Sequence, residues 1–180
     1  DTEPNNSFST AQVLAQNVTT TGHFGYYYNN IRDTFDWYKI VITTSGALQL
    51  SYTQNSGNNC GYFQIFDNDG ITAINTETFN CGGTNNQTTD GLQPGTYYIR
   101  IRNYNGSFAT YTLTNTLILP AIGTDPEPNN TRGQAKPLQV NNTVTGQFGY
   151  RFNGGLRDSV DWWRVTTNAA GLLQLQYTQN

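Results

Sequence analysis

Part of this sequence occurs twice. Residues 1–55 and 125–180 align with one inserted glycine, and 27 of the 55 aligned positions are identical. The two segments open with DTEPNN and DPEPNN, and they close with LSYTQN and LQYTQN. The period is roughly 125 residues, which is the size of one ordinary domain. The repeat predicts a tandem array in which a complete unit is followed by the first part of a second.

Short runs of alternating apolar and polar residues predict an all-β fold. In the first copy these runs are residues 37–42, 47–52, 62–66, 71–74, 96–101 and 111–114, with turn residues between them. Roughly seven or eight short strands at this spacing are typical of an antiparallel β-sandwich. One short helix is expected from Ser7 to about Leu14, with Asn6 or Ser7 as its N-cap.

The period divides the chain into three segments. Residues 1–118 form a complete first copy, residues 119–124 a linker, and residues 125–180 the N-terminal part of an incomplete second copy. Part of a sandwich leaves its inner face and edge strands open, so we expect a longer chain or a neighbouring chain to complete it. Residues 56–180 also span one period and are an alternative division, but residues 120–124 are more linker-like than residues 55–59.

The composition argues against several classes of function. Charged residues make up 12% of the chain and the net charge is −3, so no basic surface is available for nucleic acid. No apolar run is long enough for a transmembrane helix, and we expect no membrane insertion. No signal peptide is recognisable in the sequence. The abundance of Asn, Thr, Gly and Tyr favours a β-rich protein that is extracellular or on the cell surface.

Cys60 and Cys81 are the only cysteines, and both lie among Gly and Asn residues. This setting predicts one disulfide formed in an oxidising compartment, with two free thiols as the alternative. Closing a loop of about 20 residues is worth on the order of 3 kcal/mol in the chain-entropy model. The spacing does not fit a CxxC metal pair.

Eight of the twelve carboxylates occupy matched positions in the two copies. Each copy has a D-x-E-P-N segment and, later, a D-x-x-D-W segment, and proline holds the first segment extended so that alternate side chains point the same way. Oxygen ligands in this number suit Ca²⁺, which takes about six to eight of them, whereas an ordinary solvated acidic surface is the alternative. The candidate ligands are Asp1, Glu3, Asn5, Asp33 and Asp36 in the first copy and Asp125, Glu127, Asn129, Asp158 and Asp161 in the second.

Four segments in order resemble the bacterial pre-peptidase C-terminal domain family, to which the collagen-binding domains of clostridial collagenases are similar. They are EPNNSFSTAQVL, DTFDWYKI, FDNDG and LQPGTYYIRI with a later YTL, and the resemblance extends over residues 1–118 and 125–180. It implies a secreted, jelly-roll-like β-sandwich. It also implies calcium ligands at Glu3, Asn5, Asp33 and Asp36 and at their counterparts in the second copy, with Asp1 and Asp125 where relatives carry another acid.

The sequence contains no recognisable catalytic arrangement. His23 is the only histidine, and Gln147 stands at its matched position in the second copy. No cysteine has a histidine partner, and no serine lies in a nucleophile motif. We therefore expect that the protein is not an enzyme.

Two non-catalytic functions fit these observations. The first is a repeat of a bacterial surface adhesin or fibre that associates with other copies of itself and is stiffened by Ca²⁺. The second is an accessory domain of a secreted peptidase or other hydrolase that binds collagen, other extracellular matrix or polysaccharide. Tyr26, Tyr27 and Tyr28 are candidate ligand contacts because aromatic rings stack on sugars and pack on peptides, although their alternation in a strand is the structural alternative.

Overall fold

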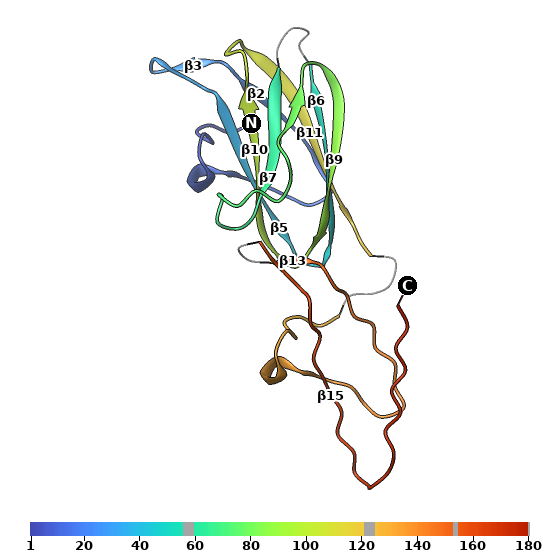
Figure 1. Cartoon of the computed structure of the whole chain (residues 1–180). Coiled ribbons are helices and arrows are strands. Elements are labelled where there is room, and N and C mark those ends of the chain that lie inside the picture. Colours follow the sequence, from blue (N-terminus) through green and yellow to red (C-terminus); the bar gives the residue numbers. More distant parts are fainter. Residues whose placement is uncertain (56–59, 121–124, 153–154, 180) are drawn as a thin grey trace.

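The computed structural model describes residues 1–55, 60–120, 125–152 and 155–179, apart from the side chains of Tyr28 and Phe152. Two packed β-sheets dominate the described chain, and two single-turn 3₁₀ helices accompany them (Figure 1). The expected all-β antiparallel sandwich is therefore confirmed. None of the described segments forms a helix of the length and apolar character that crossing a membrane requires.

The first sheet has five strands in the order β1-β5-β10-β7-β8. β1 pairs in parallel with β5, and the other neighbours are antiparallel. The strand bounds are β1 (Gln12–Leu14), β5 (Phe35–Ile42), β7 (Gly61–Phe66), β8 (Thr78–Asn80) and β10 (Gly95–Asn103).

The second sheet has six strands in the order β14-β13-β9-β6-β11-β2, and β14 and β13, at one edge, come from the second copy. The strands are β2 (Thr19–Phe24), β6 (Gly46–Gln54), β9 (Gly83–Leu92), β11 (Ala109–Ile118), β13 (Arg151–Phe152) and β14 (Leu156–Arg157). Two small pairs complete the described strands: β3 (Tyr27–Tyr28) with β4 (Ile31–Arg32), and β12 (Lys136–Pro137) with β15 (Trp163–Arg164).

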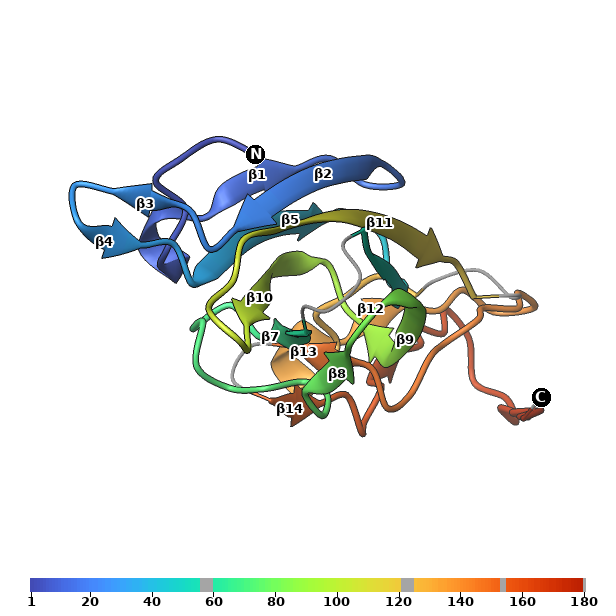
Figure 2. The ribbon, with the colours of Figure 1, turned by 90° about the horizontal axis from the view of Figure 1, so that it is seen from above.

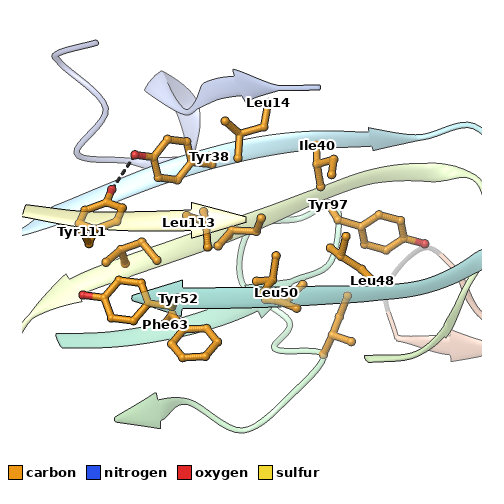
Figure 3. Close-up of a cluster of buried hydrophobic side chains, with 14 of the residues drawn as sticks. Leu14, Tyr38, Ile40, Leu48, Leu50, Tyr52, Phe63, Tyr97, Tyr111 and Leu113 are labelled. Atoms are coloured by element: carbon orange, nitrogen blue, oxygen red, sulfur yellow. Dashed lines mark hydrogen bonds between the residues drawn. The ribbon is translucent and has the colours of Figure 1, made fainter. Parts of the chain in front are cut away.

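The core lies between the two sheets and follows from strand alternation (Figure 3). In β6, for example, Leu48, Leu50 and Tyr52 are fully buried, and the residues between them are partly exposed. Burial of each large apolar side chain contributes about 1.5–3 kcal/mol. Every residue of this core cluster lies between Leu14 and Leu117, so the core is built by the first copy.

The helix expected from Ser7 to Leu14 is wrong. The structure has a single 3₁₀ turn, η1 (Phe8–Thr10), followed directly by strand β1. Leu14 is buried in the core, and the backbone of β1 pairs with β5. The neighbouring strand satisfies the backbone of residues 12–14, and this tertiary contact overrides the weak local helix signal.

Two other strand expectations need correction. Residues 71–74 form no strand beyond a single bridge between Phe66 and Ala73, because the Asp69 carboxylate accepts the backbone N–H groups of Ile71 and Thr72 at 2.8 Å and holds a turn. Strand β9 has no apolar alternation along most of its length, so the sequence pattern missed it. Its pairing with β6 makes it a strand. The other expected runs lie within β5, β6, β7, β10 and β11.

The described elements of the second copy correspond to those at the start of the first. A 3₁₀ turn, η2 (Arg132–Gln134), matches η1, and β12 pairs in parallel with β15 in the register that β1 has with β5. The described residues 165–179 form no strand. Leu173, Leu175 and Tyr177, which match core residues of β6, are exposed. Residues 121–124 of the expected linker lie outside the described residues.

Candidate metal centre

Backbone pairing brings the two acidic segments of the first copy together. The backbone N–H of Trp37 donates to the carbonyl of Asn5 at 2.8 Å, so the D-x-E-P-N segment lies against the start of β5. Asp36 is buried within β5, and Asp33 lies just before that strand. Carboxylates that are about 30 residues apart in sequence therefore face one site.

The first-copy acids form two adjoining groups. One oxygen each of Glu3, Asp33 and Asp36 lies within 4.8 Å of the others. Asp1 and Glu3 form a second group with His23, in which Asp1 Oδ1 lies 2.5 Å from His23 Nδ1. Asn5 joins the groups, because its Nδ2 donates to Asp1 Oδ2 at 3.2 Å and its backbone N–H donates to Glu3 Oε2 at 3.1 Å.

The second copy repeats this geometry in a tighter form. Asp125, Glu127, Asp158 and Asp161 make a single group with one oxygen each within 4.8 Å of the others. Asn129 Nδ2 donates to Asp125 Oδ2 at 3.0 Å, and its backbone N–H donates to Glu127 Oε2 at 2.9 Å. Within the described residues, all ten predicted ligands therefore lie in or beside two matched clusters.

Among the described residues, the same three side-chain oxygen atoms of each copy lack a hydrogen-bond partner. They are buried, and in Asn5, Asp36 and Asn129 the whole residue is inaccessible to solvent. An unpaired buried acceptor costs about 1–3 kcal/mol, so these matched atoms fit the ligand set of a bound cation. The atoms are Asn5 Oδ1, Asp33 Oδ2 and Asp36 Oδ1 in the first copy and Asn129 Oδ1, Asp158 Oδ2 and Asp161 Oδ1 in the second.

The protein itself satisfies the other oxygen of three of these carboxylates. The Tyr111 hydroxyl donates to Asp36 Oδ2 at 2.5 Å. With the amides of Asn6 and Asn130 oriented so that their nitrogens donate, each lies 2.7 Å from Oδ1 of Asp33 and Asp158, respectively. Each carboxylate is thus held by one oxygen and offers the other to a ligand. A donor set made only of oxygen fits a hard divalent cation.

Burial disfavours the charged form of these carboxylates in the metal-free protein and so raises their pKa values. Burial raises the pKa of Asp36 to about 8, with the charges of Asp33 and Glu3 acting in the same direction and the hydrogen bond from the Tyr111 hydroxyl opposing them. Burial and the charge of Glu3 raise the pKa of Asp33 to about 7. In the second copy, burial is likewise the first cause that raises the pKa of Glu127 to about 7.

The metal-free protein is therefore expected to lose stability as the pH rises. The folded-state pKa values of Asp33 and Asp36 lie above the unfolded value of 3.8, so the fold binds more protons than the unfolded chain. The stabilisation is complete below about pH 4 and is lost as the pH rises through about 7 to 8. Thermal melts in EDTA should show a lower Tm at about pH 8 than at about pH 5, by at least about 5 °C. A Tm that is constant or rises over this range would contradict the assignment.

The candidate ligand contacts lie beside the first acidic cluster. Tyr26 and Tyr27 are 48% and 67% exposed, so neither is a core residue. They line a cavity of about 620 Å³ together with Glu3, His23 and Ile31. The side chain of Tyr28 lies outside the described residues.

The sequence patterns missed the aromatic support beneath the first cluster. Tyr111 is fully buried, and its hydroxyl lies 2.6 Å from that of Tyr38, as the dashed line in Figure 3 shows. Alternation places both rings in the core, but only the packed structure places their hydroxyls next to Asp36.

The disulfide between Cys60 and Cys81 is confirmed, and it excludes the free-thiol alternative.

Comparison with solved structures finds similarity to the pre-peptidase C-terminal domain of a collagenase from Bacillus anthracis. The identity is 16%, the match covers 64% of this chain and 100% of that chain, and the TM-score is 0.49. This solved structure belongs to the pre-peptidase C-terminal domain family, which the sequence resembles.

Two further solved structures are similar to this chain. One is a carbohydrate-binding module of a Cellvibrio mixtus lichenase, with 17% identity, coverage of 48% of this chain and 74% of that one, and a TM-score of 0.36. The other is a periplasmic inhibitor of g-type lysozyme from Aeromonas hydrophila, with 12% identity, coverage of 59% and 98%, and a TM-score of 0.35. No protein-family model and no curated protein matches the sequence.

Proposed function

We propose that this chain is a non-catalytic extracellular repeat module in which each copy binds one Ca²⁺ ion between its two acidic segments. The observation that carries the proposal is the set of buried, unpartnered oxygens at matched positions in both copies. A bound cation would pair with these atoms and offset the repulsion among the neighbouring carboxylates. The ligands would be Asp1, Glu3, Asn5, Asp33 and Asp36 in the first copy and Asp125, Glu127, Asn129, Asp158 and Asp161 in the second.

The position of the second cluster supports a stiffening role for the ion. Glu127 Oε2 accepts the backbone N–H of Asn129, and its Oε1 accepts Nε2 of Gln93 from the first copy at 2.9 Å. One carboxylate therefore belongs both to the cluster and to the joint between the copies. An ion held by Glu127 would fix this side chain and with it the angle between copies, as an adhesin or fibre requires.

Added Ca²⁺ is expected to raise the Tm of the chain. Each occupied site at about 100 times its Kd would add about 2.7 kcal/mol to the free energy of unfolding, which is roughly 5 to 10 °C per site for a chain of this size. Differential scanning calorimetry at about pH 8 would measure the shift after EDTA treatment. The expectation is a smaller effect with Mg²⁺, which prefers a near-ideal octahedral site that retains several waters.

Two substitutions, one inside the first acidic cluster and one outside both clusters, test where Ca²⁺ causes the Tm shift. Asp36→Asn keeps the size of the side chain but removes a ligand charge, so the Ca²⁺-induced shift of the first copy should be lost. Asp69→Asn changes an exposed carboxylate outside both clusters and should leave the shift unchanged. No Tm change at millimolar Ca²⁺ in the unsubstituted chain, or an equal loss in both variants, would refute the proposed sites.

A further inference from the structure

The β13–β14 hairpin of the second copy docks on one edge of the first copy. The Arg151 carbonyl accepts the backbone N–H of Gln93 at 2.8 Å and the hydroxyl of Tyr97 at 3.3 Å. Arg157 Nη2 lies 2.5 Å from Asp90 Oδ2. In Figure 1 this hairpin lies at the lower end of the sandwich, where it extends the sheet beyond β9.

Side-chain packing makes this contact specific. The Tyr150 ring covers Gly91 so closely that a Cβ at Gly91 would lie 2.6 Å from Cε1 of the ring. The backbone N–H of Gly155 donates to Asp67 Oδ2 at 2.8 Å. We call residues 90–93 of the first copy the acceptor edge. This edge offers the carboxylate of Asp90, the backbone of Gly91 without a side chain, and the backbone N–H of Gln93.

The first copy carries the same hairpin at its opposite end. Figures 1 and 2 show β3 and β4 projecting beyond the sandwich, away from β13. Tyr26 and Arg32 match Tyr150 and Arg157 of the docked hairpin, and Glu3 matches Glu127. In the described structure β3 and β4 pair only with each other, and Tyr27 and Ile31 are 67% and 70% exposed.

We propose that the β3–β4 face (Glu3, Tyr26, Tyr27, Ile31 and Arg32) docks onto residues 90–93 of another copy of the repeat unit. The occupant is inferred from the interface already present in the chain, where matched residues of the second copy sit on that edge. Arg32 then pairs with Asp90, and the Tyr26 ring covers Gly91. The loop between β13 and β14 is one residue longer than the loop between β3 and β4, so the contact between Gly155 and Asp67 is not part of the proposed match.

This docking predicts a difference between the full chain and its first copy alone. Residues 1–120 contain the whole core cluster, the disulfide and every strand of the two large sheets except β13 and β14, so they form a complete folding unit. In the full chain the hairpin of the second copy occupies the acceptor edge. In the shortened chain the acceptor edge is open, and Tyr27 and Ile31 of the β3–β4 face are exposed. Arg32 donates to the Gly106 carbonyl and Tyr26 packs against Phe108 within the same copy, so docking has to compete with these contacts. Sedimentation velocity should show head-to-tail association of residues 1–120 with rising concentration, while the full chain stays monomeric.

Charge reversal tests the contact itself. Arg32→Asp or Asp90→Arg should each abolish association of residues 1–120. A mixture of the two single variants should associate again, because Arg32 of one can pair with Asp90 of the other, and the variant that carries both changes should associate through the reversed pair alone. Circular dichroism before each run verifies the β-sandwich. In the full chain, Tyr150→Ala with Arg157→Asp frees the edge and should induce association that Arg32→Asp then removes. Monomers throughout both series, or association that neither charge reversal weakens, would overturn the proposal.

Discussion

Replacing Gly22 with alanine is expected to lower the free energy of unfolding by about 3 kcal/mol, or the Tm by about 10 °C. Gly22 lies in β2 opposite Tyr111 of β11. A Cβ at Gly22 would overlap the Cζ and hydroxyl oxygen of Tyr111 and lie 2.7 Å from its Cε1. The ring cannot retreat easily, because it stacks on Phe24 and packs against Tyr52 in the core.

The same substitution is expected to weaken the calcium response. The displaced Tyr111 hydroxyl would release both Tyr38 and Asp36, so the carboxylate would lose the donor that fixes it. Calorimetry with and without Ca²⁺ measures both effects. Gly95→Ala is the matched control, because Gly95 also lies in a strand and its Cβ would meet Tyr97 only at 3.6 Å. Equal stability of the two variants would show that the Tyr111 ring is not confined as described.

Removing the disulfide by Cys60→Ser together with Cys81→Ser is expected to cost about 3 kcal/mol. The bond closes a loop with a sequence separation of 21 residues, and its loss restores the conformational freedom of that loop in the unfolded chain. It also ties β8 to the neighbourhood of β7, at the edge of the five-stranded sheet. Urea unfolding at a fixed Ca²⁺ concentration would measure the difference in free energy.

Reduction provides the control for this prediction. A thiol reductant should lower the urea midpoint of the unsubstituted chain toward that of the double variant and leave the variant unchanged. The slope of the urea transition should rise slightly, because an unlinked unfolded chain exposes more surface. An unsubstituted chain whose midpoint is insensitive to complete reduction would show that the bond contributes nothing to stability.

Alternation of apolar and polar residues predicted the central strands correctly, but it did not predict strands whose side chains are polar at most positions. Strand β6 buries every second residue over its length, and β5 and β10 do so over most of theirs, so burial drives their formation. Strand β9 has polar residues at most positions and is stabilised by backbone pairing with β6. The segment from Ser7 to Leu14 was wrongly predicted as a helix. The end of this segment pairs with β5, more than 20 residues away in sequence, and a local pattern does not reveal such a partner.

The repeat, the β-rich class and the matched acids could be recognised from the amino-acid sequence alone, because they depend on residue types and spacing within short segments. Three features required the folded chain: the unpaired buried oxygens of Asn5, Asp33 and Asp36, the hydrogen bond from Tyr111 to Asp36, and the docking of the second copy's hairpin on residues 90–93. These features arise from contacts between residues far apart in the chain. Local pattern carries no information about such contacts, because packing of the whole sandwich sets which distant groups meet.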